Sequence, residues 1–197
     1  MKFLTELLKI NDKKIVLASQ SPRRVQLLRD IGLSFEIHPA GVDENPASYH
    51  DEVDYARQNA ASKAYWVQDR VTADLIISAD TIVAMEGQIF EKPASREEAT
   101  VTLKQLSGKT HQVISAFCML SDNSEIINHA VTDVVFHSFS GHEIETYLNS
   151  GEAFDKAGAY GIQGLASIFI KKINGCYYNV MGFPIAQFYQ HLKGLKL

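Results

Sequence analysis

The segment Ser19–Arg24 contains residues that could bind an anion. It follows an apolar run, Lys14–Ala18, whose β-branched residues predict a buried strand. The next residues carry apolar side chains at helical spacing up to Gly32, so we expect Ser21 to cap a helix whose first residue is Pro22. Unpaired N–H groups and a partial positive charge at such a helix start favour a bound phosphate.

Arg23 and Arg24 would lie in the first turn of that helix. Their guanidinium groups offer several donors each and suit a polyphosphate. Two cations beside the positive end of a helix dipole cost stability unless an anion binds there. The alternative is that both arginines are solvated or paired with surface carboxylates.

Asp80 follows a second apolar run, Leu75–Ser78, which also predicts a buried strand. Acidic residues at strand ends of α/β sheets commonly hold metals or act in catalysis. Asp80 could bind Mg²⁺ or accept a proton from an attacking water. An aspartate at a strand end is also a frequent turn or capping residue.

Other charged residues lie on separate segments. They are Asp43 and Glu44 in a polar loop, Lys63 on a predicted helix and Lys92 after a predicted hairpin. Hydrolysis of a phosphoanhydride requires neutralised phosphate oxygens and a positioned water, and such residues could supply both. Each alone is more often a solvated surface charge.

The segment Asp155–Gly164 contains three glycines within seven residues, which indicates close backbone approach or positive φ angles. Gln163 within it has an amide that could both donate to and accept from a nucleobase. The segment lacks the G-x-G-x-x-G spacing of dinucleotide sites. It could also be a turn without a binding role.

The remaining patterns predict alternating strands and helices, hence an α/β fold with a mixed sheet. We expect residues 1–14 to form a largely helical N-terminal extension and residues 15–197 a single domain. The elements expected in that domain are strands at 14–18, 35–38, 75–78, 112–120, 126–136 and 167–173, a hairpin across Glu86-Gly87, and helices at 22–31, 54–70, 95–106, 140–149 and 184–192.

Composition excludes several classes of protein. The 197 residues are 46% hydrophobic and 21% charged, as in globular domains, and the net charge of −4 gives no basic surface for nucleic acid. Apolar runs are too short to span a membrane, and the N-terminus lacks the features of a signal peptide. Cys118 and Cys176 show no metal-binding spacing, so we expect two buried thiols in a cytoplasmic protein.

Taken together, these segments resemble the Maf family of nucleoside triphosphate pyrophosphatases. The resemblance runs from about Ile15 to Phe188 and rests on LASQSPRR at 17–24, VDENP at 42–46, ASKA at 61–64, SADTIV at 78–83, EKP at 91–93, DKAGAYGIQG at 155–164 and YNVMGFP at 178–184. It implies a fold like that of Maf and ITPase proteins, with a mixed twisted sheet flanked by helices and two lobes around a central cleft. The implied reaction converts a nucleoside triphosphate to the monophosphate and pyrophosphate with Mg²⁺ or Mn²⁺.

The resemblance also implies roles for individual residues. Asp80 would be the proton acceptor and, with Glu44, would bind the metal. Substrate specificity would depend on Arg23, Thr81 and Gln163. The residues implied to bind phosphate or substrate are Ser19, Ser21, Arg23, Arg24, Lys63 and Lys92.

The sequence Ile162-Gln163-Gly164 resembles the branch of the family that prefers dTTP and UTP, and a homodimer is compatible with the resemblance. The chain departs from the family pattern in its N-terminal extension, at Ser115-Ala116 and at Phe90-Glu91. Two alternatives stay open. One is a pyrophosphatase for methylated GTP, and the other is a nucleotide-binding regulator of cell division with vestigial catalysis.

Overall fold

A computed structural model describes residues 2–44 and 48–197. It confirms the α/β class with a mixed sheet. Within the described residues the sheet has seven strands in the order β2-β1-β3-β5-β6-β7, with β4 paired to β3. The strands are β1 (Ile15–Leu17), β2 (Glu36–Ile37), β3 (Leu75–Met85), β4 (Gln88–Phe90), β5 (Thr110–Ser121), β6 (Ser124–Phe136) and β7 (Ile170–Asn174).

The helices alternate with these strands along the chain. They are α1 (Phe3–Leu7), α2 (Pro22–Asp30), α3 (Glu52–Gln68), α4 (Arg96–Leu106), α5 (Gly141–Asn149), α6 (Tyr177–Val180) and α7 (Ile185–Gly194). Three short 3₁₀ helices, η1 (Glu152–Asp155), η2 (Ala157–Ala159) and η3 (Leu165–Phe169), lie in and beside the glycine-rich segment. No helix in the described part of the chain is long and apolar enough to cross a membrane.

The chain divides into two compact units. Unit 1 comprises residues 1–80, 115–130 and 182–197, and unit 2 comprises residues 81–114 and 131–181.

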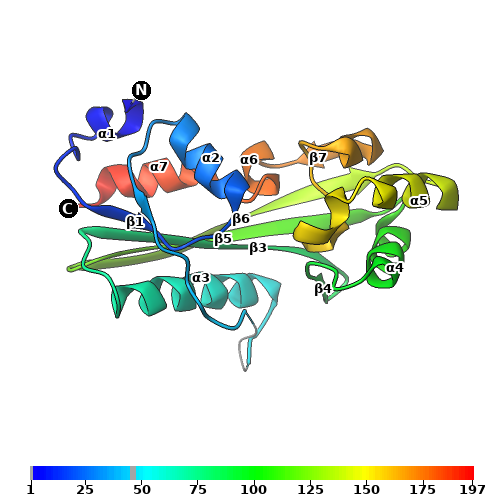
Figure 1. The fold of residues 1–197 in the computed structure, drawn as a ribbon, viewed down its shortest axis with the longest axis horizontal. Helices are drawn as coiled ribbons and strands as arrows, with labels where there is room; N and C mark the ends of the chain where they lie inside the picture. The colour runs from blue at the N-terminus through cyan, green and yellow to red at the C-terminus, as the bar shows by residue number, and fades with distance from the viewer. Residues whose placement is uncertain (1, 45–47) are drawn as a thin grey trace. The chain divides into compact units, whose positions relative to one another are not determined.

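In unit 1, β1 pairs in parallel with both β2 and β3. The helices α2 and α7 lie on one side of these strands and α3 lies on the other (Figure 1). Both faces of β1 are therefore covered, which explains why all three of its residues are buried and apolar. Ser115 and Ala116, where the chain departs from the family pattern, are fully buried in β5 of the same unit.

The N-terminal extension is less helical than predicted. Its helix, α1, has only five residues, and the chain turns away at Lys9, whose φ is 57°. The segment is fixed by contacts with the end of α2: the Leu4 N–H donates to the Ile31 carbonyl at 3.1 Å, and the Thr5 hydroxyl donates to the Gly32 carbonyl at 3.1 Å. Those tertiary hydrogen bonds stabilise a helix too short to form alone.

In unit 2 the predicted hairpin is confirmed. Val83–Met85 of β3 pair antiparallel with β4, and both turn residues, Glu86 and Gly87, have positive φ, as a two-residue hairpin turn requires. β3 continues to Met85, well beyond Ser78, where the sequence predicted that the strand would end. Phe90, another departure from the family pattern, is buried at the end of the hairpin.

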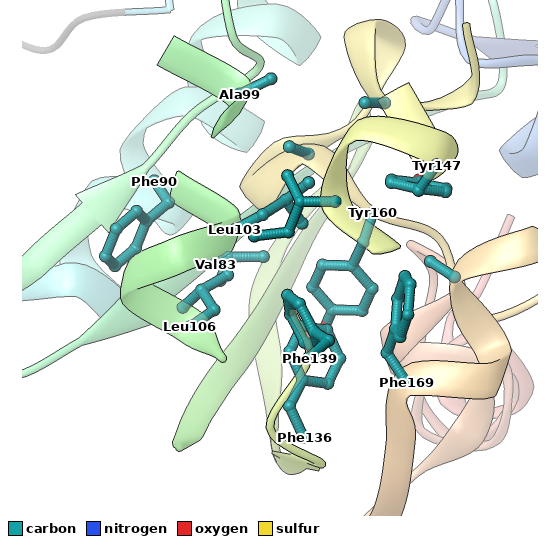
Figure 2. Packing of buried hydrophobic residues seen from close by; sticks show 14 of the residues in the cluster. Val83, Phe90, Ala99, Leu103, Leu106, Phe136, Phe139, Tyr147, Tyr160 and Phe169 are labelled. Carbon is teal, nitrogen blue, oxygen red and sulfur yellow. The ribbon is translucent and has the colours of Figure 1, made fainter. Parts of the chain in front are cut away.

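The core of unit 2 is rich in aromatic side chains (Figure 2). The rings of Phe139 and Phe169 lie 4.5 Å apart, and that of Phe136 packs edge-on against Tyr160 at 4.8 Å. The strand predicted at 167–173 begins later, at Ile170, because residues 165–169 form η3 and bring Phe169 into this core.

Serine side chains cap two helices of unit 2. Ser95 caps α4 by accepting from the Glu98 N–H at 3.1 Å, and the Glu98 carboxylate accepts from the Ala94 N–H at 2.8 Å, so this pair does not form a complete capping box. The complete capping box is at α5, between Ser140 and Glu143. Both serine caps stabilise helix starts in unit 2.

Candidate active site

The segment after β1, Ser19–Arg24, is the turn that the sequence predicts to bind an anion. The Ala18 N–H donates to the Ile77 carbonyl at 2.7 Å, and the chain then turns into α2. Ser21 caps α2, as predicted, by accepting from the Arg24 N–H at 3.4 Å, and Pro22 is the first helical residue. The helix start therefore faces the segment that carries Ser19 and Ser21.

Arg24 is buried, with 7% of its surface exposed. Its Nε donates to the Gly182 carbonyl at 3.2 Å and its Nη1 to the Ser19 Oγ at 2.7 Å. Burial lowers the pKa of Arg24 to about 10, while the charges of Asp80 and Glu44 act to raise it. The guanidinium is therefore still cationic at neutral pH.

Ser19 is a hydrogen-bond acceptor for two groups. Its Oγ accepts from Arg24 Nη1 at 2.7 Å and from the Ser21 N–H at 3.2 Å. A hydroxyl has two lone pairs and one hydrogen, so these contacts occupy its acceptor capacity. Its remaining capacity is to donate, which suits a phosphate oxygen.

Asp80 lies within β3 and not at its end, which corrects the prediction. The residue is buried, with 5% of its surface exposed. Oδ1 accepts from Lys63 Nζ at 2.7 Å and Oδ2 accepts from Asn59 Nδ2 at 3.2 Å. The buried charge is thus paired and hydrogen-bonded, as its desolvation demands.

Lys63 also contacts the second predicted acid. Its Nζ lies 3.0 Å from Glu44 Oε1, so one ammonium group bridges Glu44 and Asp80. The Glu44 carbonyl accepts from Tyr55 Oη at 2.7 Å and from Asn59 Nδ2 at 3.3 Å. Asn45 and Pro46 of the same VDENP motif lie outside the described residues.

Tyr55 and Asn59, which are not among the predicted residues, also contact Glu44 or Asp80. Together with Lys63 they are spaced four residues apart on α3, which places all three on one helix face. A polar stripe at that spacing on a helix with a buried face was the signal available in the sequence.

The turn Ser19–Arg24 and the acidic cluster, formed by Glu44 and Asp80, are neighbours. Asp80 and Glu44 are close enough to Arg24 to raise its pKa against the effect of burial. The reason is topological: β1 and β3 are adjacent parallel strands with Leu17 opposite Ile77, so the residues beyond this pair on each segment extend in the same direction.

The other predicted residues differ in position. Arg23 is half-buried in the first turn of α2. Thr81 follows Asp80 in β3 but belongs to unit 2, as do Lys92 and Gln163, whose side chains are exposed. That these three residues share one site with the cluster of unit 1 stays a prediction.

The donor set of Glu44 and Asp80 fits a hard divalent cation. Their two carboxylates already contact a common cation, the Lys63 ammonium group. No group of three or more His, Cys, Asp or Glu side chains is arranged for a metal within residues 2–44 and 48–197. Mg²⁺ is commonly held by one or two carboxylates together with substrate phosphates, and that arrangement matches these residues.

Known proteins resemble this chain over nearly its whole length. The family model described as Maf-like protein matches residues 14–195. A protein of Clostridium perfringens (strain SM101) named dTTP/UTP pyrophosphatase is 42% identical over 184 residues, which are 91% of this chain and 96% of that protein. A protein of the same name from Syntrophomonas wolfei is 45% identical over 175 residues, 88% of this chain and 93% of the relative.

A solved structure supports the fold. The Ham1 protein of Staphylococcus aureus aligns with a TM-score of 0.56 over 93% of this chain and 100% of its own, at 12% sequence identity. That likeness concerns the arrangement of strands and helices alone. The family match and the close relatives together show that this chain belongs to the Maf family.

Proposed function

We propose that this protein hydrolyses dTTP and UTP between the α and β phosphates, giving the nucleoside monophosphate and pyrophosphate. The observation that carries the proposal is the pairing of a buried acid, Asp80, with an adjacent anion-binding turn that contains Arg24. Relatives named dTTP/UTP pyrophosphatase at 42% and 45% identity support the choice of nucleotide.

The site residues of unit 1 would have different roles in the reaction. Ser19 would donate its hydroxyl hydrogen to a phosphate oxygen, and Arg23 and Arg24 would neutralise the charge of the triphosphate. The carboxylate of Asp80 would take the proton of a water that adds to the α phosphorus, while the bond to the bridging oxygen breaks and pyrophosphate leaves. Lys63 would orient the Asp80 carboxylate through their 2.7 Å contact.

Glu44 and Asp80 would hold the divalent cation, Mg²⁺ or Mn²⁺, on their carboxylate oxygens. When bound, the metal supplies positive charge to the phosphate oxygens and favours departure of pyrophosphate. We propose that Lys92, Thr81 and Gln163 of unit 2 would also contact the substrate and that Gln163 would recognise the pyrimidine edge.

We also propose a cytoplasmic location. The thiols of Cys118 and Cys176 are both free, but only Cys118 is buried and Cys176 is half-buried, which corrects the prediction of two buried thiols. Burial raises the pKa of Cys118 to about 12, which keeps that thiol unreactive. A homodimer stays a prediction, which sedimentation of the purified protein would test.

The test is pyrophosphate release from a panel of nucleoside triphosphates with Mg²⁺, comparing wild type with Asp80→Asn. We expect dTTP and UTP to be the best substrates and the variant to lose about 100-fold or more in kcat, as loss of a general base implies. Asp122→Asn, which removes the same charge from an exposed hairpin turn of unit 1, should keep full activity.

Three results would contradict the proposal. Full activity in a folded Asp80→Asn variant would remove Asp80 from the reaction. Preference for a methylated guanine nucleotide would favour that alternative. Tight nucleotide binding without pyrophosphate release under Mg²⁺ or Mn²⁺ would favour a regulator.

A further inference from the structure

The glycine-rich segment forms a closed turn that presents Gln163. The Gly164 N–H donates to the Gly161 carbonyl at 3.3 Å, so Ile162 and Gln163 occupy the two central positions. The Gln163 side chain is exposed, as a residue that binds a ligand requires. The Ser167 N–H donates back to the Gly164 carbonyl at 3.0 Å and joins the turn to η3.

Glu152 contacts the residues that leave this turn. Its Oε2 accepts from the Leu165 N–H at 2.8 Å, and its Oε1 accepts from Tyr147 Oη at 3.4 Å. Glu152 begins η1 and is half-buried. A side chain twelve residues before Gly164 therefore holds the backbone that follows the turn.

Gly164 shows how close this contact is. Its φ is −101°, a conformation that any L residue adopts, so the backbone alone does not require glycine. A Cβ atom at Gly164 would overlap the carboxyl carbon and both carboxylate oxygens of Glu152. The glycine at the end of the Ile162-Gln163-Gly164 sequence is thus explained by the carboxylate of Glu152.

Lys156 makes the matching contact at the other side of the turn. A Cβ at Gly161 would lie 2.8 Å from Lys156 Cε, and Lys156 Nζ donates to the Glu152 carbonyl at 2.6 Å. Glu152 and Lys156 therefore pack against both glycines that flank Ile162 and Gln163.

We infer that Glu152 is a positioning residue that fixes the Gln163 turn for recognition of the nucleobase. This inference rests on the proposed function, in which Gln163 binds the pyrimidine edge. An amide can discriminate between bases only if its donor and acceptor stay in register with the base, and a displacement of about 1 Å is enough to lose that register. Glu152 does not touch substrate and acts through the Leu165 N–H and Gly164.

The first test compares Glu152→Ala, Glu152→Gln and Gln163→Ala in steady-state kinetics with dTTP and dCTP. We expect Glu152→Ala to raise KM for dTTP about tenfold with kcat changed less than threefold, and to reduce the preference for dTTP over dCTP as Gln163→Ala does. Glu152→Gln keeps an oxygen that can accept from Leu165 and should restore both quantities. Glu145→Gln, an exposed change on α5, is the matched control.

The second test is a double-mutant cycle with Gly164→Ala. In the wild-type background the new methyl group must displace the Glu152 carboxylate, whereas in Glu152→Ala it meets no carboxylate. We expect Gly164→Ala to lose about tenfold in kcat/KM for dTTP alone and less than twofold in the Glu152→Ala background. Equal losses in both backgrounds would overturn the inference.

Amide hydrogen exchange at Leu165 separates this inference from the proposed function. Exchange should accelerate in Glu152→Ala and return toward wild type in Glu152→Gln. Faster exchange with unchanged KM and unchanged nucleotide preference would overturn the positioning role. If wild type released no pyrophosphate, the proposed function would fail, and the Kd for dTTP would then test the positioning role of Glu152. An equal increase of this Kd in Glu152→Ala and Gln163→Ala would support the role. An unchanged Kd would overturn it.

Discussion

At the scale of single residues, Arg24 and Ser19 act as one unit. The buried guanidinium donates to the Gly182 carbonyl at 3.2 Å and to Ser19 Oγ at 2.7 Å. It therefore fixes the position of the turn Ser19–Arg24 and also gives this turn a positive charge. A planar guanidinium group with separate donors can make both contacts. A lysine ammonium group is a single point charge and cannot reproduce this geometry.

This geometry predicts the effect of Arg24→Lys. We expect the free energy of unfolding to fall by about 1–3 kcal/mol, because a buried acceptor loses its partner, and KM for dTTP to rise about tenfold. Urea denaturation and steady-state kinetics measure the two effects. Arg29→Lys, an exposed change on the same helix, should alter neither, and an Arg24→Lys protein with wild-type stability and KM would disprove this role.

At the scale of elements, α3 organises the acidic cluster. Its stripe of Tyr55, Asn59 and Lys63 places donors against the Glu44 carbonyl and the Asp80 carboxylate. Consecutive members of the stripe lie one helical turn apart, so the rigid helix sets the spacing between the loop that carries Glu44 and the strand that carries Asp80. The site therefore depends on the docking of one helix.

Asn59→Asp tests the stripe with almost no change in volume. The variant replaces a donor with a carboxylate 3.2 Å from Asp80 Oδ2, and the two negative charges repel. We expect kcat/KM to fall by at least about tenfold, and Asn59→Ala to have the smaller effect, since it removes the donor without adding charge. The exposed change Gln68→Glu adds the same charge at the end of α3 and should leave kcat/KM unchanged. Equal kcat/KM in Asn59→Asp and wild type would refute the role of the stripe.

At the scale of the whole molecule, stability depends on keeping a histidine neutral. His111 is 1% exposed in the core of unit 2, where its Nε2 lies 2.7 Å from Tyr160 Oη and its Nδ1 has no partner within the described residues. Burial lowers the pKa of His111 from 6.5 to about 4 and raises that of Tyr160. Neither group is charged in the folded protein at neutral pH.

This burial predicts a loss of stability in mild acid. Below pH 6.5 the unfolded chain binds a proton at His111 that the folded chain does not bind until about pH 4, so the free energy of unfolding falls as pH decreases through this window. The contribution is about 3 kcal/mol between pH 7.5 and pH 4, since one pKa unit corresponds to about 1.4 kcal/mol. Denaturation at several pH values, wild type beside His111→Gln, measures it.

Carboxylates that titrate in the same range are common to both proteins and cancel in the comparison. Equal pH dependence for wild type and His111→Gln would show that the histidine does not contribute. A smaller decline in His111→Gln is the expected result.

Local signals in the sequence determined much of this protein. The Ser21 cap followed by Pro22, the hairpin at Glu86-Gly87 and the Ser140 cap each depend on residues close in the chain, so they could be predicted with nearly correct bounds. The sequence predicts Arg24, Lys63 and Asp80 as site residues from their chemistry, and the three lie in one neighbourhood.

Contacts between distant segments were decided only by the tertiary structure. Periodicity does not show that β3 continues through Asp80, that Lys63 bridges Asp80 to Glu44, or that α1 stops at Leu7. Nor does it show why Gly164 must be a glycine, because the obstacle is the side chain of Glu152 and not the local backbone. Local hydrogen bonds and spacing are encoded along the chain, whereas burial, ion pairing and steric exclusion depend on which segments meet when the chain folds.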